Sequence, residues 1–359
     1  MNICPSNLVC LLLHLQPRGL AGEYLAQVGA GALLVASTTA LPSQENNFPN
    51  FTPKHRSLMA KHLTKTLYDK LKYKHSSKGY TLDMAIQTGI NNPHLRVGVV
   101  AGDEERYQVF KDSMTLCIEG WYGYKPEDKH LTDMDVSKLE NAEMINNAYV
   151  QSIRVGAGRN IRGLSLPPGT THSERLKVNM TKGRERSTSE KIFSHSKTWG
   201  GTLLTGAGAA RNWQSGRGVF HNDQKTLLVW WNEEDHMRVI SMQSDGNIVE
   251  VFARWVKAVE AVEASVKANR YSFTHNEHLG FLGACPSHMG TGLLCTLLGL
   301  QLRGSAGEHS AAIGGMWDIL NKSRIGKPEV ELFLTMIDVA GKLIELEKEW
   351  ENGKSYADV

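Results

Sequence analysis

The sequence predicts an α+β protein: a small, mostly helical N-terminal part is followed by a larger part that mixes strands with helices. Capping signals and helical apolar spacing recur up to about Asp135, whereas β-rich runs lie within residues 226–242. Strands and helices do not alternate as regular βαβ units, which favours the α+β class. At 359 residues the chain exceeds one ordinary small core, so we expect two domains.

Two segments carry the helical signal in the N-terminal part. Residues 62–71 contain Thr64, a good N-cap candidate. The run that starts at Asp103 opens with acidic residues, which suit the positive end of a helix, and continues with apolar spacing.

The larger part contains both kinds of element. Residues 226–231 and 238–242 are β-rich and are joined by a short acidic connection. Apolar residues recur at helical spacing over residues 249–267, which predicts a helix. A last helix is expected from about Pro328 to Asn352, with Gly353 at its stop.

The first 47 residues differ from the rest of the chain. They carry only three charged side chains, and their apolar runs are too short to span a bilayer. No basic region precedes the first apolar run, as a secretory signal would require. We expect residues 1–47 to be a disordered leader, with a weak mitochondrial presequence as the alternative.

Composition excludes several classes of protein. Lys and Arg number 40 against 37 Asp and Glu, and this balance gives no support to a general nucleic-acid or membrane-surface role. Five widely spread cysteines without a CxxC pair indicate neither a disulfide framework nor a zinc site, and fit a reducing compartment.

The acidic connection is the first candidate for chemistry. In Trp231-Asn-Glu-Glu-Asp-His236, the carboxylates Glu233, Glu234 and Asp235 are adjacent and repel one another, so cations are expected nearby. The alternative is a solvated hairpin turn, which is common for such a sequence.

A second candidate is Cys285-Pro-Ser-His-Met-Gly-Thr-Gly292. The hydroxyl of Ser287 and nearby backbone N–H groups would favour a thiolate at Cys285. The alternative is a buried structural cysteine beside a loop.

Scattered arginines beside glycines are the third candidate: Arg154, Arg159, Arg238 and Arg303. An arginine next to glycine suits a charged fork above a backbone that must approach a phosphate closely, although each could also be a surface arginine. Taken together, cations and positioned carboxylates are what phosphoryl transfer needs.

Longer segments now show a family resemblance. Its carriers are Tyr80-Thr-Leu-Asp-Met-Ala-Ile-Gln-Thr-Gly-Ile-Asn-Asn-Pro, Val99-Val-Ala-Gly-Asp-Glu-Glu, Arg159-Asn-Ile-Arg-Gly-Leu-Ser-Leu-Pro-Pro, Asn232-Glu-Glu-Asp-His-Met-Arg-Val-Ile-Ser-Met and Cys285-Pro-Ser. With these, the sequence resembles the creatine kinases of the ATP:guanido phosphotransferase family from about Phe48 to the C-terminus. Ser287 after Cys-Pro points to the creatine branch.

The resemblance implies a fold and an activity. Residues 48–138 would form a small all-α N-terminal domain, and residues 149–359 a catalytic domain with an antiparallel sheet flanked by helices. The activity would be reversible transfer of the ATP γ-phosphoryl group to the guanidino nitrogen of creatine. Partners would be ATP or ADP, creatine or phosphocreatine, and a second subunit in a homodimer or family heterodimer, with no nucleic acid and no transmembrane span. We expect a cytoplasmic location, with a mitochondrial one as the alternative.

The resemblance also implies roles for single residues. Glu234 would orient or deprotonate the guanidinium with support from Glu233, and Cys285 would be a thiolate tuned by Ser287, with Val97 also on the substrate side. The residues expected along ATP are Ser152, Arg154, Val155, Arg238, Arg303, Gly304, Ser305, Gly307 and Asp318. Mg²⁺ would be held by the phosphates and water, with no protein metal cluster.

The sequence departs from the family pattern at two phosphate-binding positions. Gly156 and Leu294 each stand where the family has an arginine, and His309 replaces an aspartate. The chain is also shorter within residues 175–203 and 294–300. The alternative is therefore a catalytically impaired relative that still binds nucleotide or dimerises.

Overall fold

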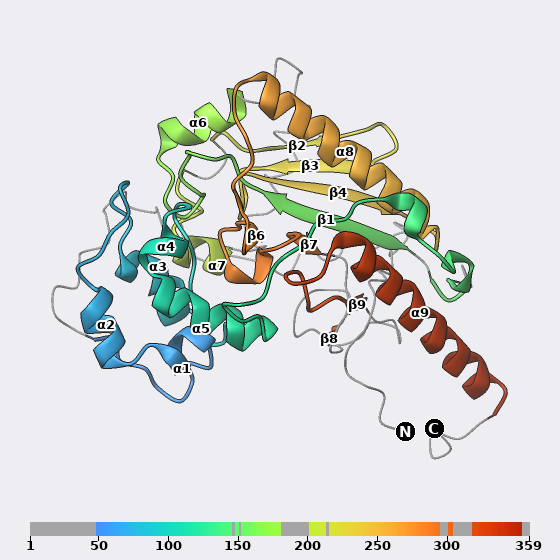
Figure 1. The fold of residues 1–359 in the computed structure, drawn as a ribbon, viewed down its shortest axis with the longest axis horizontal. Coiled ribbons are helices and arrows are strands. Elements are labelled where there is room, and N and C mark those ends of the chain that lie inside the picture. Colours follow the sequence, from blue (N-terminus) through green and yellow to red (C-terminus); the bar gives the residue numbers. More distant parts are fainter. Residues whose placement is uncertain are drawn as a thin grey trace, which may run out of the picture.

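The structure is a computed structural model that describes residues 48–145, 148–150, 152–180, 201–212, 215–294, 301–303 and 318–353. The predicted leader and four positions named above lie outside these ranges: Gly304, Ser305, Gly307 and His309. Figure 1 shows two regions, with helices α1 to α5 gathered on one side and a sheet with two long helices on the other.

The N-terminal helices are α1 (Leu58–His62), α2 (Lys65–Leu71), α3 (Leu82–Asn91), α4 (Arg106–Val109) and α5 (Lys111–Tyr122). The cap predicted at Thr64 is confirmed, because its hydroxyl accepts a hydrogen bond from the Leu67 N–H at 3.2 Å. One prediction needs correction. The helix expected from Asp103 begins only at Arg106, because the Asp103 carboxylate accepts a hydrogen bond from the Arg106 N–H as a cap would.

A five-stranded sheet forms the centre of the larger region. Its order is β2 (Gly218–His221), β3 (Leu227–Trp231), β4 (Met237–Gln243), β1 (Ile153–Arg159) and β7 (Leu293–Leu294). Every neighbouring pair is antiparallel, so the predicted antiparallel sheet is confirmed. The acidic connection lies between β3 and β4, which pair directly as a hairpin.

Shorter elements surround this sheet. They are η1 (Val136–Lys138), η2 (Ala142–Met144), α6 (His172–Met180), α7 (Gly201–Gly206), β5 (His275–Asn276), β6 (Gly280–Phe281), η4 (Pro286–His288), β8 (Gln301–Arg303) and β9 (Asp318–Leu320).

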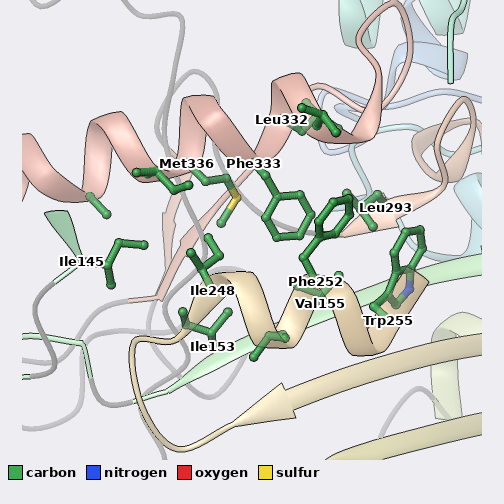
Figure 2. Packing of buried hydrophobic residues seen from close by; sticks show 14 of the residues in the cluster. Ile145, Ile153, Val155, Ile248, Phe252, Trp255, Leu293, Leu332, Phe333 and Met336 are labelled. Carbon is green, nitrogen blue, oxygen red and sulfur yellow. The ribbon is translucent and has the colours of Figure 1, made fainter. Parts of the chain in front are cut away.

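Two long helices cover one face of the sheet. They are α8 (Ile248–Ala268) and α9 (Glu329–Glu351), close to the bounds that the apolar spacing predicts. Figure 2 shows Phe252 and Trp255 of α8 against Phe333 of α9, and the rings of Phe252 and Phe333 are 4.1 Å apart between centroids. This core fixes one face of the sheet against α8 and α9. The opposite face of the sheet is therefore the one that can line a binding site.

Strand alternation decides which side chains lie on that other face. Val155 and Val239 are fully buried in the helix-side core. Since successive side chains point to opposite faces, Arg154, Gly156 and Arg238 belong to the face away from α8 and α9. None of the described helices is long and apolar enough to cross a membrane.

Candidate active site

The acidic connection between β3 and β4 is a buried, hydrogen-bonded turn. Asn232 adopts a left-handed conformation with φ of 56°, and its side-chain amide donates to the Gly216 carbonyl at 2.7 Å. Asn232, Asp235 and His236 are all buried. The alternative of a solvated hairpin turn is therefore wrong.

Two side chains fasten this turn to the chain around it. Asp235 Oδ1 accepts hydrogen bonds from the Asn160 side-chain amide and the Ala284 N–H, both at 2.7 Å. His236 Nδ1 accepts from the Ile161 N–H at 3.0 Å, and its Nε2 donates to a carbonyl at 2.8 Å. Burial lowers the pKa of His236 to about 4, so the ring is neutral and acts as a fixed spacer. Asp235 and His236 are therefore fixed, and Glu233 and Glu234 are the two acidic residues of the turn that stay partly exposed.

The segment that begins at Cys285 lies against the acidic turn. Cys285 precedes the short helix η4, and its Sγ is 3.1 Å from Ser287 Oγ. The N-terminal helices brace this segment: Tyr107 of α4 donates to the Gly283 carbonyl at 2.7 Å, and Tyr122 of α5 donates to the Ser287 carbonyl at 2.6 Å. The two regions of the chain therefore meet at the site.

A partly buried arginine, Arg324, completes this arrangement. Arg324 Nη1 donates to the Ser287 carbonyl at 2.6 Å, and its own carbonyl accepts from the Thr291 N–H at 2.8 Å. Gly290 allows the approach: its φ is 75°, and a Cβ atom there would lie 2.1 Å from the Arg324 carbonyl oxygen. Only glycine fits at this crossing.

These segments surround a cleft of about 300 Å³. The N-terminal region contributes residues 95–100 and Trp121, and α7 contributes Leu203 and Leu204. The larger region contributes side chains that can carry charge or donate protons, together with apolar neighbours. They are Glu234, Arg238, Cys285, Ser287, His288, Leu294, Leu320, Asn321, Lys322 and Arg324. A site of this size between two regions is typical of a ligand-binding cleft.

Glu234 is the perturbed carboxyl group of the cleft. Burial raises its pKa to about 8, with the Arg238 and Arg324 guanidinium groups opposing that effect. Its Oε2 lies 3.3 Å from Nδ1 of His288. A carboxyl group that titrates near neutral pH can take up and release a proton at the operating pH of an enzyme.

The thiol of Cys285 differs from the expectation. Burial and the neighbouring carboxyl of Glu234 raise its pKa to about 12, although the Ser287 hydroxyl opposes that shift. These surroundings favour the neutral thiol, and the thiolate expected from the sequence stays a prediction. The sequence shows the hydroxyl but not the adjacent carboxyl group, which comes from a distant turn.

The structure brings together only part of the predicted site. Glu234, Cys285, Ser287, Arg238 and Val97 line one cleft. Glu233 lies in the same turn, where its Oε2 accepts a hydrogen bond from the Glu234 N–H at 3.1 Å.

The residues expected along the nucleotide are dispersed. Arg154 lies on the open sheet face with its guanidinium 5.6 Å from the Trp230 ring centroid, and Ser152 is buried just before β1. Val155 packs into the core, so its side chain cannot reach a nucleotide. Arg303 and Asp318 are opposite one another in the β8–β9 pair.

The two departures from the family pattern meet in space. Gly156 of β1 and Leu294 of β7 are register partners, so both lie at one point of the sheet. Leu294 also lines the cleft. The sheet is therefore apolar at the point where the family pattern would place two arginines side by side.

Three cleft residues were missed by sequence reasoning: Trp121, His288 and Arg324. His288 lies inside the Cys285–Gly292 motif and could have been singled out as a titratable group beside a candidate thiol. Arg324 is 37 residues from Ser287, whose carbonyl it contacts, and no local pattern marks such a partner.

Comparison with known proteins shows the family and the fold. Residues 53–119 match the profile of the ATP:guanido phosphotransferase N-terminal domain, and residues 169–297 and 293–350 match that of the C-terminal catalytic domain. The chain belongs to the ATP:guanido phosphotransferase family. The catalytic-domain match of this guanido phosphotransferase is split at residues 293–297, where a missing stretch is predicted.

Relatives with different substrates in their names are about equally similar to this guanido phosphotransferase. It is 39% identical to creatine kinase B-type of Gallus gallus over 364 residues, covering 88% of this chain and 95% of that one. It is 38% identical to arginine kinase of Stichopus japonicus over 358 residues, covering 88% and 96%. The crystal structure of lombricine kinase superposes with a TM-score of 0.77 at 35% identity, covering 87% of this chain and 97% of that one.

Proposed function

We propose that this guanido phosphotransferase reversibly transfers the γ-phosphoryl group of ATP to the guanidino nitrogen of creatine. The observation that carries the proposal is the convergence of Glu234, Cys285 and Arg238 on one cleft. Creatine is favoured over other guanidines by Ser287 beside Cys285, within hydrogen-bond distance.

Different residues of the cleft serve different parts of the reaction. A nitrogen–phosphorus bond forms as the bond from the γ-phosphorus to the bridging oxygen breaks, and ADP leaves. The proton of the attacking guanidino N–H goes to the carboxylate of Glu234, which is suited to this because its pKa is raised to about 8. The guanidinium groups of Arg238 and Arg324 offset the negative charge that develops on the transferred group.

Mg²⁺ enters this proposal as a partner of the nucleotide. Glu234 is the carboxylate of the described cleft lining, and it stands among Arg238, Arg324 and Lys322, so this donor set fits an ion carried by phosphates. When bound, the ion neutralises charge on the β- and γ-phosphates.

The test is a coupled assay of the purified protein with MgATP and a panel of guanidines: creatine, arginine and lombricine. We expect turnover with creatine to exceed turnover with the other two. Faster turnover with arginine or lombricine would contradict the choice of creatine, and absence of turnover with all three would contradict the activity.

A second candidate is a relative that binds nucleotide without efficient transfer. The pairing of Gly156 with Leu294 favours it, because two charged contacts to phosphate are missing at one point of the sheet. Each such contact is worth about 3–4 kcal/mol in comparable sites. Calorimetry with MgADP separates the candidates: binding without turnover supports the second, and turnover with creatine supports the first.

A further inference from the structure

His288 is a partly buried histidine that has no role in the proposed reaction. Its Nδ1 lies 3.3 Å from Glu234 Oε2 and 3.9 Å from Asp235 Oδ2. Only 14% of the side chain is exposed, and within the described part of the chain Nδ1 has no hydrogen-bond partner. A buried ring nitrogen aimed at a carboxyl group without completing a bond is a site where a proton can settle.

The surroundings decide the charge of the ring. Arg324 and Arg238 lie within electrostatic reach, and with burial they lower the pKa of His288 well below its usual range. The imidazole is therefore neutral, so one nitrogen carries a hydrogen and the other accepts one. Glu234 is the nearer of the two carboxyl groups, at 3.3 Å from Nδ1 against 3.9 Å for Asp235, whose Oδ1 also accepts hydrogen bonds from the Asn160 amide and the Ala284 N–H. Glu234 is therefore the carboxyl group with which His288 can share a proton.

We propose that His288 is a positioning residue that shares one proton with Glu234 and changes tautomer when Glu234 changes charge. This inference rests on the proposed function for its role in turnover, but the pairing itself does not.

The pairing works in both protonation states of the carboxyl group. While Glu234 is protonated, its O–H donates to Nδ1, and the ring hydrogen resides on Nε2. Once Glu234 has lost its proton, Nδ1–H donates to the carboxylate and Nε2 is bare. In both states Oε2 is held by His288, so Oε1 remains turned toward the substrate.

Other titratable and charged groups face this pair, and they must be considered in any pH experiment. They are Glu233 and Asp235 in the same turn, Arg238 on β4, Cys285 before η4, Tyr122 on α5 and Arg324 after β9. Burial raises the pKa of Tyr122 and of Cys285 above the range in which Glu234 titrates. The change of tautomer therefore follows Glu234.

The first experiment needs no turnover. Protein labelled with ¹⁵N at its 14 histidines is observed by long-range ¹H–¹⁵N NMR, and His288 is assigned by its absence from the His288→Asn spectrum. We expect the ring hydrogen to move from Nε2 to Nδ1 between pH 6.5 and 9.5, with a midpoint of about 8. The Glu234→Gln protein should show no movement, whereas His62→Asn, a change on α1 away from the cleft, should leave it intact.

The second experiment uses turnover. His288→Ala should lower kcat about tenfold to a hundredfold, the usual size of an effect through an outer contact, while the KM values for guanidine and nucleotide change less than about twofold. His288→Asn keeps a side-chain amide beside Oε2 and should restore most of the loss. Thermal melts of the two variants show whether folding is affected.

The two experiments distinguish failure of the inference from failure of the proposed function. A ring hydrogen that stays on one nitrogen across the pH range, or that still moves in Glu234→Gln, overturns the pairing whether or not the protein turns over. Movement of the hydrogen without turnover supports the pairing and counts against the proposed activity. Turnover that His288→Ala leaves unchanged overturns the positioning role.

Discussion

Two walls of the cleft differ sharply in chemistry. The wall made by the β3–β4 turn, η4 and Arg324 is dense with groups that move or offset charge, and Glu234 and His288 are 3.3 Å apart in it. The wall at Leu294 of β7 is apolar, and the register partner of Leu294 on β1 is Gly156. We call the wall that contains Glu234 and His288 the proton wall, and the apolar wall at Leu294 the apolar seam.

The difference teaches which part of the reaction the chain is equipped for. Proton transfer depends on a few groups at short range. In the proton wall the turn that carries Glu234 is fixed by the buried hydrogen bonds of its neighbours Asp235 and His236. Binding of a triphosphate depends on converging cations, and the apolar seam offers none. We therefore expect proton transfer from the guanidine to be less impaired than binding of the nucleotide phosphates.

The largest expected effect is loss of the proton wall's acceptor. Glu234→Gln cannot take up the guanidine proton, so kcat should fall by about 10²–10⁴. MgADP affinity should change little, because the side chain faces the guanidine. Coupled assays and calorimetry measure the two quantities, with His62→Asn as the control. Retention of more than a tenth of the turnover would remove Glu234 from its proposed role.

The apolar seam can be tested by adding what it lacks. Leu294→Arg places a guanidinium at the cleft lining, where a charged hydrogen bond to phosphate is worth about 1.5–3 kcal/mol. MgADP should bind about 10- to 100-fold tighter by calorimetry. Position 156 is the worse choice, since a Cβ there would lie 3.2 Å from Ile240 Cγ1.

The matched control at the seam is Leu294→Gln, which is polar and of similar length but uncharged. It should leave MgADP affinity within about twofold of the parent. Equal tightening by both substitutions, or by neither, would show that charge at the seam does not limit nucleotide binding.

Local features of this fold were predictable from the sequence. Thr64 caps a helix through a hydrogen bond three residues along the chain, and residues 249–267 form a helix because their apolar spacing matches one face. Both signals depend on near neighbours. The two strands beside the acidic connection were predictable for the same reason.

The electrostatics of the site were not predictable in this way. The pKa of Cys285 is raised by burial and by a carboxyl group about fifty residues earlier in the chain, and Arg324 donates to the carbonyl of Ser287, 37 residues earlier. Such partners follow from register and from close approaches such as that at Gly290. A resemblance can supply the positions of these residues, but it does not supply their charge states.

The proton wall also predicts how stability depends on pH. The folded pKa of Glu234 is about 8 against an ordinary value of 4.5, so the folded state binds this proton more tightly than the unfolded state. Below pH 4.5 both states are protonated and the group has no effect. Between these values the free energy of unfolding falls as pH rises, and the loss is complete above pH 8.

Glutamine cannot ionise, so Glu234→Gln removes this loss. Its advantage over the parent in free energy of unfolding should grow from near zero at pH 4.5 to on the order of 5 kcal/mol at pH 9. Urea denaturation at several pH values measures it, and the contribution of His236 cancels in the difference because both proteins carry it. A difference that is flat with pH would mean that Glu234 is ionised throughout.

The smallest effect concerns the thiol of the proton wall. With the pKa of Cys285 near 12, iodoacetamide should alkylate it about tenfold or more slowly at pH 8 than it alkylates the same residue in the urea-unfolded chain. Peptide mapping by mass spectrometry separates it from the other cysteines. Glu234→Gln should speed the reaction, because a neighbour that raises the pKa is removed. Alkylation faster than in the unfolded chain would instead show that Cys285 is the thiolate that the sequence predicts. The proton wall would then already carry a negative charge that can pair with an incoming guanidinium.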